Sequence, residues 1–138
     1  AWVKPAGAGS MRILDKGRAG SNDAYMVDTH PEGNLRVITS RGGFSKDLTL
    51  PLNAWSHLAL TYDNAALTLY LNGTVLDQVK TTGPLTVTDL PLHIGADSGG
   101  GSRFTGVMDG VMLWNRALTV EEIGRYMLDA PGGAGRQN

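Results

Sequence analysis

Apolar and polar residues alternate along most of the chain in runs of about five to eight residues, which is typical of β-strands with one buried face. The clearest runs are residues 56–62 and 66–71, in which a leucine or Tyr62 stands at every second position. A weaker run at 34–40 places Leu35, Val37 and Thr39 on one side. The pattern predicts strands at 11–14, 24–28, 34–40, 56–62, 66–71, 75–79, 92–96 and 107–114.

The dipeptide Asn72-Gly73 separates two of these runs. Both residues tolerate the left-handed backbone conformation that a two-residue type I′ turn requires. We therefore expect residues 66–71 and 75–79 to form a β-hairpin.

A single helix is predicted near the end of the chain. Thr119 and Glu122 have the spacing of a capping box, and Leu118 and Ile123 have that of a hydrophobic staple. These signals predict a short helix at 120–128, followed by a flexible tail at 129–138 that is rich in glycine.

Composition restricts the class of protein. A chain of 138 residues that is 41% hydrophobic is the size and balance of one globular domain, which we place at residues 1–128. No apolar run is long enough to cross a membrane, and a net charge of -1 argues against binding to nucleic acid or to an anionic membrane. Cysteine is absent, which excludes disulfides, and the 19 glycines indicate many tight turns.

Many short strands followed by one late helix favour an all-β fold, an antiparallel two-sheet jelly-roll sandwich with one short C-terminal helix. Five segments, taken in order, also resemble the laminin G-like jelly roll of the concanavalin A-like lectin/glucanase superfamily. They are Ala1-Trp2-Val3-Lys4-Pro5, residues 52–63, Leu69-Tyr70-Leu71-Asn72-Gly73, Ile94-Gly95-Ala96-Asp97 and residues 104–118.

Domains that this chain resembles begin with further strands ahead of the segment that matches Ala1 to Pro5. Without them, a sheet edge is left unpaired and favours pairing with another chain. We therefore expect either a fragment of a longer domain or an edge-mediated homo-oligomer.

The superfamily includes glucanases, which carry paired carboxylates with the spacing Glu-x-Asp-x-Glu or Glu-x-Asp-x-x-Glu on one strand. Neither spacing occurs in this chain. Its three glutamates are Glu32 in an expected turn and Glu121 and Glu122 in the helix cap. No Gly-x-Ser-x-Gly elbow is present either. We expect no catalytic residues and no enzymatic activity.

Calcium is the metal that the resemblance implies, since many laminin G-like domains hold one ion with carboxylates and backbone carbonyls. Asp109 matches the family's aspartate in its strand, and Asp97 stands at the mouth of a glycine-rich loop. Asp15, Asp23 and Asp28 could join Asp97 in a different site at the rim. The alternative for each aspartate is a role in capping a turn.

Carbohydrate binding requires aromatic rings that stack on sugars and polar groups that fix hydroxyls. Alternation places His57 and Tyr70 on the face opposite the leucines, where they would line a cleft if that face is concave. The loop from Asp97 to Arg103 is the alternative site, because Arg103 offers forked donors and its glycines permit close approach.

These observations give two main hypotheses of function, and an enzyme with an unrecognised site is the third. The first is a noncatalytic module for adhesion or for binding a glycan or polysaccharide, in a secreted or cell-surface multidomain protein, where it contacts other domains and could be attached to a polysaccharide-degrading enzyme. The second is a structural or assembly domain that pairs through an open sheet edge and binds no sugar.

Overall fold

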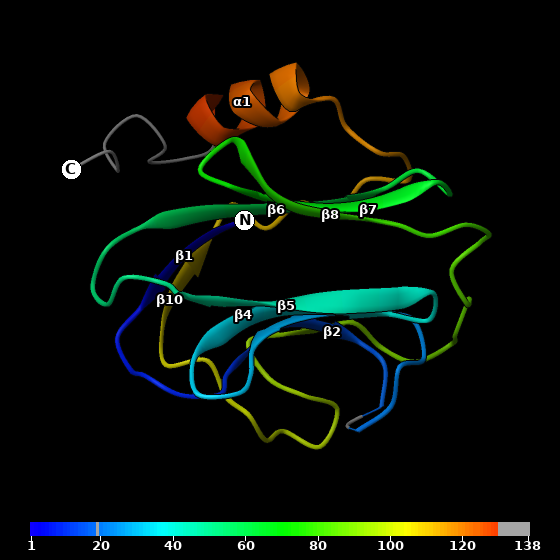
Figure 1. Ribbon diagram of the computed structural model, residues 1–138. Helices are drawn as coiled ribbons and strands as arrows, with labels where there is room; N and C mark the ends of the chain where they lie inside the picture. Colours follow the sequence, from blue (N-terminus) through cyan, green and yellow to red (C-terminus); the bar gives the residue numbers. More distant parts are fainter. Residues whose placement is uncertain (19, 130–138) are drawn as a thin grey trace.

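The computed structural model describes residues 1–18 and 20–129, and the expected tail lies outside these residues from position 130 onward. The described strands form two antiparallel five-stranded sheets packed face to face (Figure 1). The first sheet has the order β10 (Gly106–Asp109), β1 (Trp2–Pro5), β6 (Ser56–Tyr62), β7 (Ala66–Leu71) and β8 (Thr74–Lys80). The second has the order β5 (Gly42–Thr49), β4 (Asn34–Thr39), β3 (Tyr25–Thr29), β2 (Arg12–Lys16) and β9 (His93–Ile94). The fold is the predicted jelly-roll sandwich.

The hydrophobic core lies between the sheets and follows the alternation in the sequence. Every second residue of β4 points inward, so that Leu35 and Val37 are fully buried. Leu67 and Leu69 of β7 are buried in the same way from the opposite sheet. The buried core consists of Val3, Ile13, Val27, Leu35, Val37, Leu50, Leu58, Leu67 and Leu69.

The predicted hairpin is confirmed. Leu71 pairs with Thr74, and the two residues between them, Asn72 and Gly73, have φ angles of 51° and 79°. These are the positive values that a type I′ turn needs, and the turn therefore sets the register of β7 against β8.

The helix α1 (Val120–Asp129) begins at the predicted capping box. The backbone N–H of Thr119 donates to the Glu122 carboxylate at 2.9 Å, and the N–H of Glu122 donates to the Thr119 hydroxyl at 3.3 Å. Figure 1 shows α1 lying over the first sheet, on the side that faces away from the second sheet. Ile123 is its one buried residue and anchors the helix there.

Four strands differ from the prediction made from alternation. β1 was indicated only by the family resemblance. β5 was not predicted, because its double glycine and its charged residues hide the alternation of a strand at the sheet edge. β9 has two residues where five were predicted, since Gly95 turns the chain away with a φ of 76°. The strand predicted at 107–114 ends at Asp109, because Asp109 lies opposite Trp2, where β1 begins, and the residues after it have no strand to pair with.

Candidate functional site

His57 and Tyr70 do lie on the outward face of the first sheet, as predicted, but α1 covers that face (Figure 1). The indole N–H of Trp2 donates to the Met127 carbonyl at 3.2 Å and ties β1 to the helix. The Trp2 ring also meets the His57 ring edge to face, with 5.3 Å between centroids. His57 is 7% exposed and Tyr70 is 8% exposed. Neither ring can stack on a sugar while α1 stays in place.

The environment of His57 keeps its imidazole neutral. Burial, and after it the positive charge of the nearby Ala1 amino group, lowers the pKa of His57 from 6.5 to about 4. A neutral ring suits a packing role between the sheet and the helix. The arrangement offers no imidazolium to a ligand at neutral pH.

The loop from Asp97 to Arg103 is built around the Asp97 carboxylate. Its Oδ1 accepts hydrogen bonds from the backbone N–H groups of Gly99 at 2.9 Å and Gly101 at 2.8 Å. The bond from Gly101 is the first cause that lowers the pKa of Asp97. A side chain at Gly101 would place its Cβ 2.9 Å from Asp97 Oδ2, so it would have to displace the carboxylate that holds the loop. Asp97 thus has the turn-capping geometry that was considered for it.

Arg103 projects from the same loop and is exposed. Its Nε donates to the Gly100 carbonyl at 2.8 Å, which holds the guanidinium against the turn. Ser98 and Ser102 of this loop are exposed too. The loop therefore presents polar side chains to solvent on a backbone that Asp97 fixes from within.

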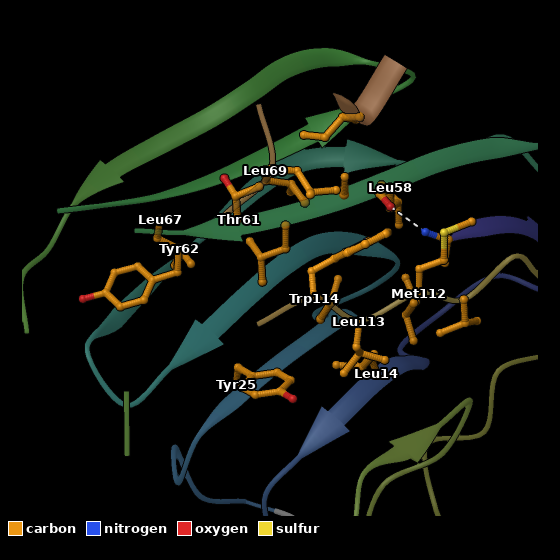
Figure 2. Close-up of a pocket in the computed structure, with 18 of the residues that line it drawn as sticks. Leu14, Tyr25, Leu58, Thr61, Tyr62, Leu67, Leu69, Met112, Leu113 and Trp114 are labelled. Atoms are coloured by element: carbon orange, nitrogen blue, oxygen red, sulfur yellow. Dashed lines mark hydrogen bonds between the residues drawn. The ribbon is translucent and has the colours of Figure 1, made fainter. Parts of the chain in front are cut away.

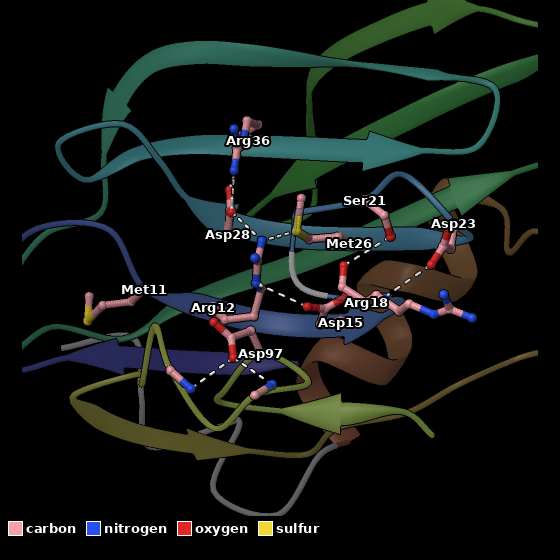
Figure 3. Close-up of polar contacts among 12 residues, drawn as sticks. Met11, Arg12, Asp15, Arg18, Ser21, Asp23, Met26, Asp28, Arg36 and Asp97 are labelled. Carbon is pink, nitrogen blue, oxygen red and sulfur yellow. Dashed lines mark hydrogen bonds and ion pairs between the residues drawn. The ribbon is translucent and has the colours of Figure 1, made fainter. Parts of the chain in front are cut away.

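A buried charged cluster lies beside this loop, on the outer face of the second sheet (Figure 3). Arg12 pairs with Asp28 at 2.5 Å and with Asp15 at 3.3 Å. Arg36 donates two hydrogen bonds to the Asp28 carboxylate, at 2.9 and 2.6 Å. Arg12, Asp15 and Asp28 are each less than a tenth exposed. Burying charged groups costs free energy of desolvation unless each charge has a partner of opposite sign. In this cluster the charges are paired in that way.

Backbone bonds join the loop to the cluster. The N–H of Arg12 donates to the Ser102 carbonyl at 2.7 Å, and the N–H of Gly95 donates to the Ile13 carbonyl at 3.0 Å. Burial raises the pKa of Asp15, and the charge of Arg12 opposes that rise. Sequence reasoning considered the aspartates but missed the two arginines, because their pairing depends on the register of β2, β3 and β4.

The aspartates proposed for calcium do not form an evident cation site. In the described residues, no group of three or more histidine, aspartate or glutamate side chains could hold a metal ion. Arg12 and Arg36 neutralise Asp15 and Asp28. Asp109 lies in the first sheet, where its Oδ1 accepts from the Gly110 N–H at 2.7 Å. The donor set therefore does not favour calcium, and calcium binding stays a prediction.

A pocket of about 650 Å³ opens between the sheets beside β6, and sequence reasoning missed it. Figure 2 shows residues of β6, β7 and the second sheet around it, together with Met112, Leu113 and Trp114. Those three residues belong to the segment that does not form the predicted strand, and each is between 39% and 52% exposed. Trp114 stacks at a tilt on Tyr126 of α1, with ring centroids 4.6 Å apart. Most of the lining is apolar.

Comparison with solved structures shows the same fold in other proteins. A Bacteroides ovatus protein proposed to bind carbohydrate matches with a TM-score of 0.76 and 21% identity, over 91% of this chain and 38% of its own. Domain 4 of AbnA, an extracellular family 43 arabinanase of Geobacillus stearothermophilus solved with arabinotriose, matches with a TM-score of 0.60 and 22% identity, over 91% of this chain and 63% of its own.

A pentraxin of Limulus polyphemus matches with a TM-score of 0.57 and 17% identity, over 89% of this chain and 65% of its own. The chain thus spans less than two thirds of the length of each of these structures. At these identities the likeness establishes the architecture alone.

The sequence itself gives the assignment to a family. A laminin G family model, described as the concanavalin A-like lectin/glucanases superfamily, matches residues 1–124, which is nearly all of the part that the structure describes. This chain therefore belongs to the concanavalin A-like lectin/glucanase superfamily, as a laminin G-like domain.

Proposed function

We propose that the chain is a noncatalytic carbohydrate-binding module, and that the loop from Asp97 to Arg103 contacts the sugar. Membership of a superfamily of lectins and glucanases supports the class of ligand. The AbnA domain solved with arabinotriose has the same fold, which makes an arabinose oligosaccharide a reasonable first ligand to test.

The observation that carries the proposal is the construction of this loop. Asp97 and the backbone bonds to β2 hold its polar residues in a fixed arrangement, so that binding a sugar costs little ordering. Arg103 presents the remaining N–H groups of a planar guanidinium, which can donate to two neighbouring hydroxyl oxygens. The buried His57 and Tyr70 are not part of this proposed site.

The absence of catalysis is part of the proposal. Glu32 is exposed in a turn with a φ of 55°, and Glu122 is engaged by Arg116 and Thr119 in the helix cap. The chain has one further glutamate, Glu121, which belongs to the same cap. None of these three pairs with a second carboxylate across a cleft in the way that glycoside hydrolysis requires.

The same proposal places the module in a secreted or cell-surface multidomain protein. It rests on the extracellular arabinanase that contains the AbnA domain. In the described residues, no helix has both the length and the apolar character needed to cross a bilayer. Attachment to a polysaccharide-degrading enzyme follows the arrangement in AbnA.

A glycan panel that includes arabinotriose, followed by calorimetry on each hit, tests the proposal. Arg103→Ala should weaken binding roughly tenfold, or about 1.4 kcal/mol, because one charged donor is lost. Arg41→Ala is the matched control. Arg41 is exposed and donates its Nε to one carbonyl, that of Pro84 at 2.7 Å, but it lies outside the loop.

The control should bind the glycan with unchanged affinity, and both variants should keep the melting temperature of the parent. Absence of any binding across the panel would contradict the class of ligand. Equal affinity of Arg103→Ala and the parent would contradict the site. Repeating the titration with a chelator tests the predicted role of calcium in the same samples.

A further inference from the structure

β5 and β8 are edge strands that meet on one side of the sandwich. β5 stands at the end of the second sheet and β8 at the end of the first, and no described strand pairs with the outer side of either. Lys46 of β5 forms an ion pair of 3.1 Å with Asp77 of β8, which places the two edges side by side. Each strand is long and free of proline, so this β5–β8 side offers two rows of unpaired main-chain groups to another chain.

Lys46 and Asp77 both point toward the space between the sheets. Lys46 alternates with Phe44 and Leu48, which pack against the core, so the three side chains lie on one face of β5. Asp77 lies opposite the fully buried Leu69 of β7, and side chains opposite each other in a sheet share a face. The rim of the core therefore carries two charges where alternation alone would favour apolar residues.

Each of these edge strands also has a β-bulge beside its charge. Leu69 and Tyr70 are consecutive in β7, but their partners in β8 are Asp77 and Val75, which leaves one extra residue in β8. The pairing of β4 with β5 also shifts register, between residues 45 and 49 of β5, a stretch that contains the lysine. Inward charges and bulges are both features by which natural sheets keep an edge from pairing, and each edge has both.

The ion pair keeps contact with solvent in the folded chain. The side chains of Lys46 and Asp77 are 36% and 31% exposed. The hydrogen bond from Lys46 is the first cause that lowers the pKa of Asp77, so the carboxylate is charged at neutral pH. A strand added to either edge would extend the core and cover both charges with its own inward side chains. Desolvation of an ion pair commonly costs more free energy than the attraction between its charges returns.

We propose that the ion pair between Lys46 and Asp77 keeps the β5–β8 side of the sandwich from pairing with a second copy of the chain. The other inward positions of these two strands are apolar, and their side chains pack against the core: Phe44, Leu48, Leu76 and Val79. Replacing the two charges with apolar residues would therefore complete an apolar rim along two unpaired strands. The proposal concerns assembly of the chain and does not depend on sugar binding.

The test replaces both inward charges at once, in the variant Lys46→Val with Asp77→Val. This variant should self-associate more than the parent chain. Its sedimentation should shift toward that of twice the parent's mass as the concentration rises from roughly micromolar to millimolar. Hydrogen exchange should slow at those amides of β5 or β8 that face away from β4 and β7, because a new strand would pair with them.

The matched control is the variant Asp47→Val with Lys80→Val. Asp47 and Lys80 are exposed and belong to the same two strands, where each stands next to an inward position and so faces outward. The control therefore makes the same change in composition and charge on the opposite face, and it should associate no more than the parent. The exchanged pair, Lys46→Asp with Asp77→Lys, should also behave like the parent, because it keeps two opposite charges inward.

A second variant, Lys46→Met with Asp77→Asn, removes both charges with little change in side-chain size and should also associate more than the parent. It separates the loss of charge from a defect in packing, and thermal melting of every variant checks that the fold is kept. Association of the two charge-free variants no greater than that of the parent would overturn the proposal. Equal association of the outward-facing control, or association without slowed exchange in β5 and β8, would overturn it as well.

Discussion

Asp97 illustrates how far residue-level reasoning reaches. An aspartate, whose side chain is short, predicts a capped turn when glycines follow it closely. The structure has that turn. The same reasoning cannot say that Arg12 and Arg36 neutralise the aspartates nearby. It also places His57 and Tyr70 on the correct face without showing that α1 covers that face. Such facts depend on contacts between residues far apart in sequence.

Two neighbouring groups make stability depend on pH. The pKa of the Ala1 amino group is about 6 in the folded chain, compared with its ordinary value of 8.0. The pKa of His57 is about 4, compared with its ordinary value of 6.5. Between pH 4 and 8 the unfolded chain therefore binds more protons, so the free energy of unfolding rises with pH through this window and levels off above it. Urea denaturation of the chain beginning at Ala1, at half-unit steps of pH, measures the rise.

Acetylation of the amino terminus is the matched control for this pH dependence. It removes the titrating amine and should abolish the part of the rise between about pH 6 and 8, while the part due to His57 remains. Loss of the neighbouring charge should also raise the pKa of His57, as followed by NMR of the imidazole. A flat profile in both forms would show that neither group is desolvated.

Elements were predicted best where their signals are local. The hairpin of β7 and β8 rests on two turn residues and a run of alternating leucines, and α1 rests on four residues around its first turn. β10 was predicted too long because a strand also needs a partner, and β1 supplies none beyond Trp2. Sequence alternation indicates what can pair, and topology decides what does.

The capping box gives a prediction at this scale. Thr119→Ala removes the hydroxyl that accepts the Glu122 N–H and should lower the free energy of unfolding by about 1 kcal/mol. Thr82→Ala, at an exposed position without regular structure, should change it by less than about 0.5 kcal/mol. Chemical denaturation measures both. Equal changes in the free energy of unfolding for the two variants would mean that the capping hydrogen bond does not stabilise α1.

At the scale of the whole molecule, the order of the motifs predicted the sandwich and its superfamily, and the family match confirms both. The candidate site was less accessible to prediction, because it depends on which loop the charged cluster supports and which face the helix covers. The unpaired sheet edge that the sequence led us to expect, with pairing to another chain, stays a prediction.

The central claim is that the loop from Asp97 to Arg103 binds a carbohydrate. An NMR titration of the isotopically labelled chain with the tightest glycan of the panel tests it most directly. We expect saturable chemical-shift changes at the amides of residues 97–103 and at neighbouring Arg12, with little change at Trp114 or in α1. Changes confined to Trp114 and the other residues around the pocket beside β6 would contradict the account.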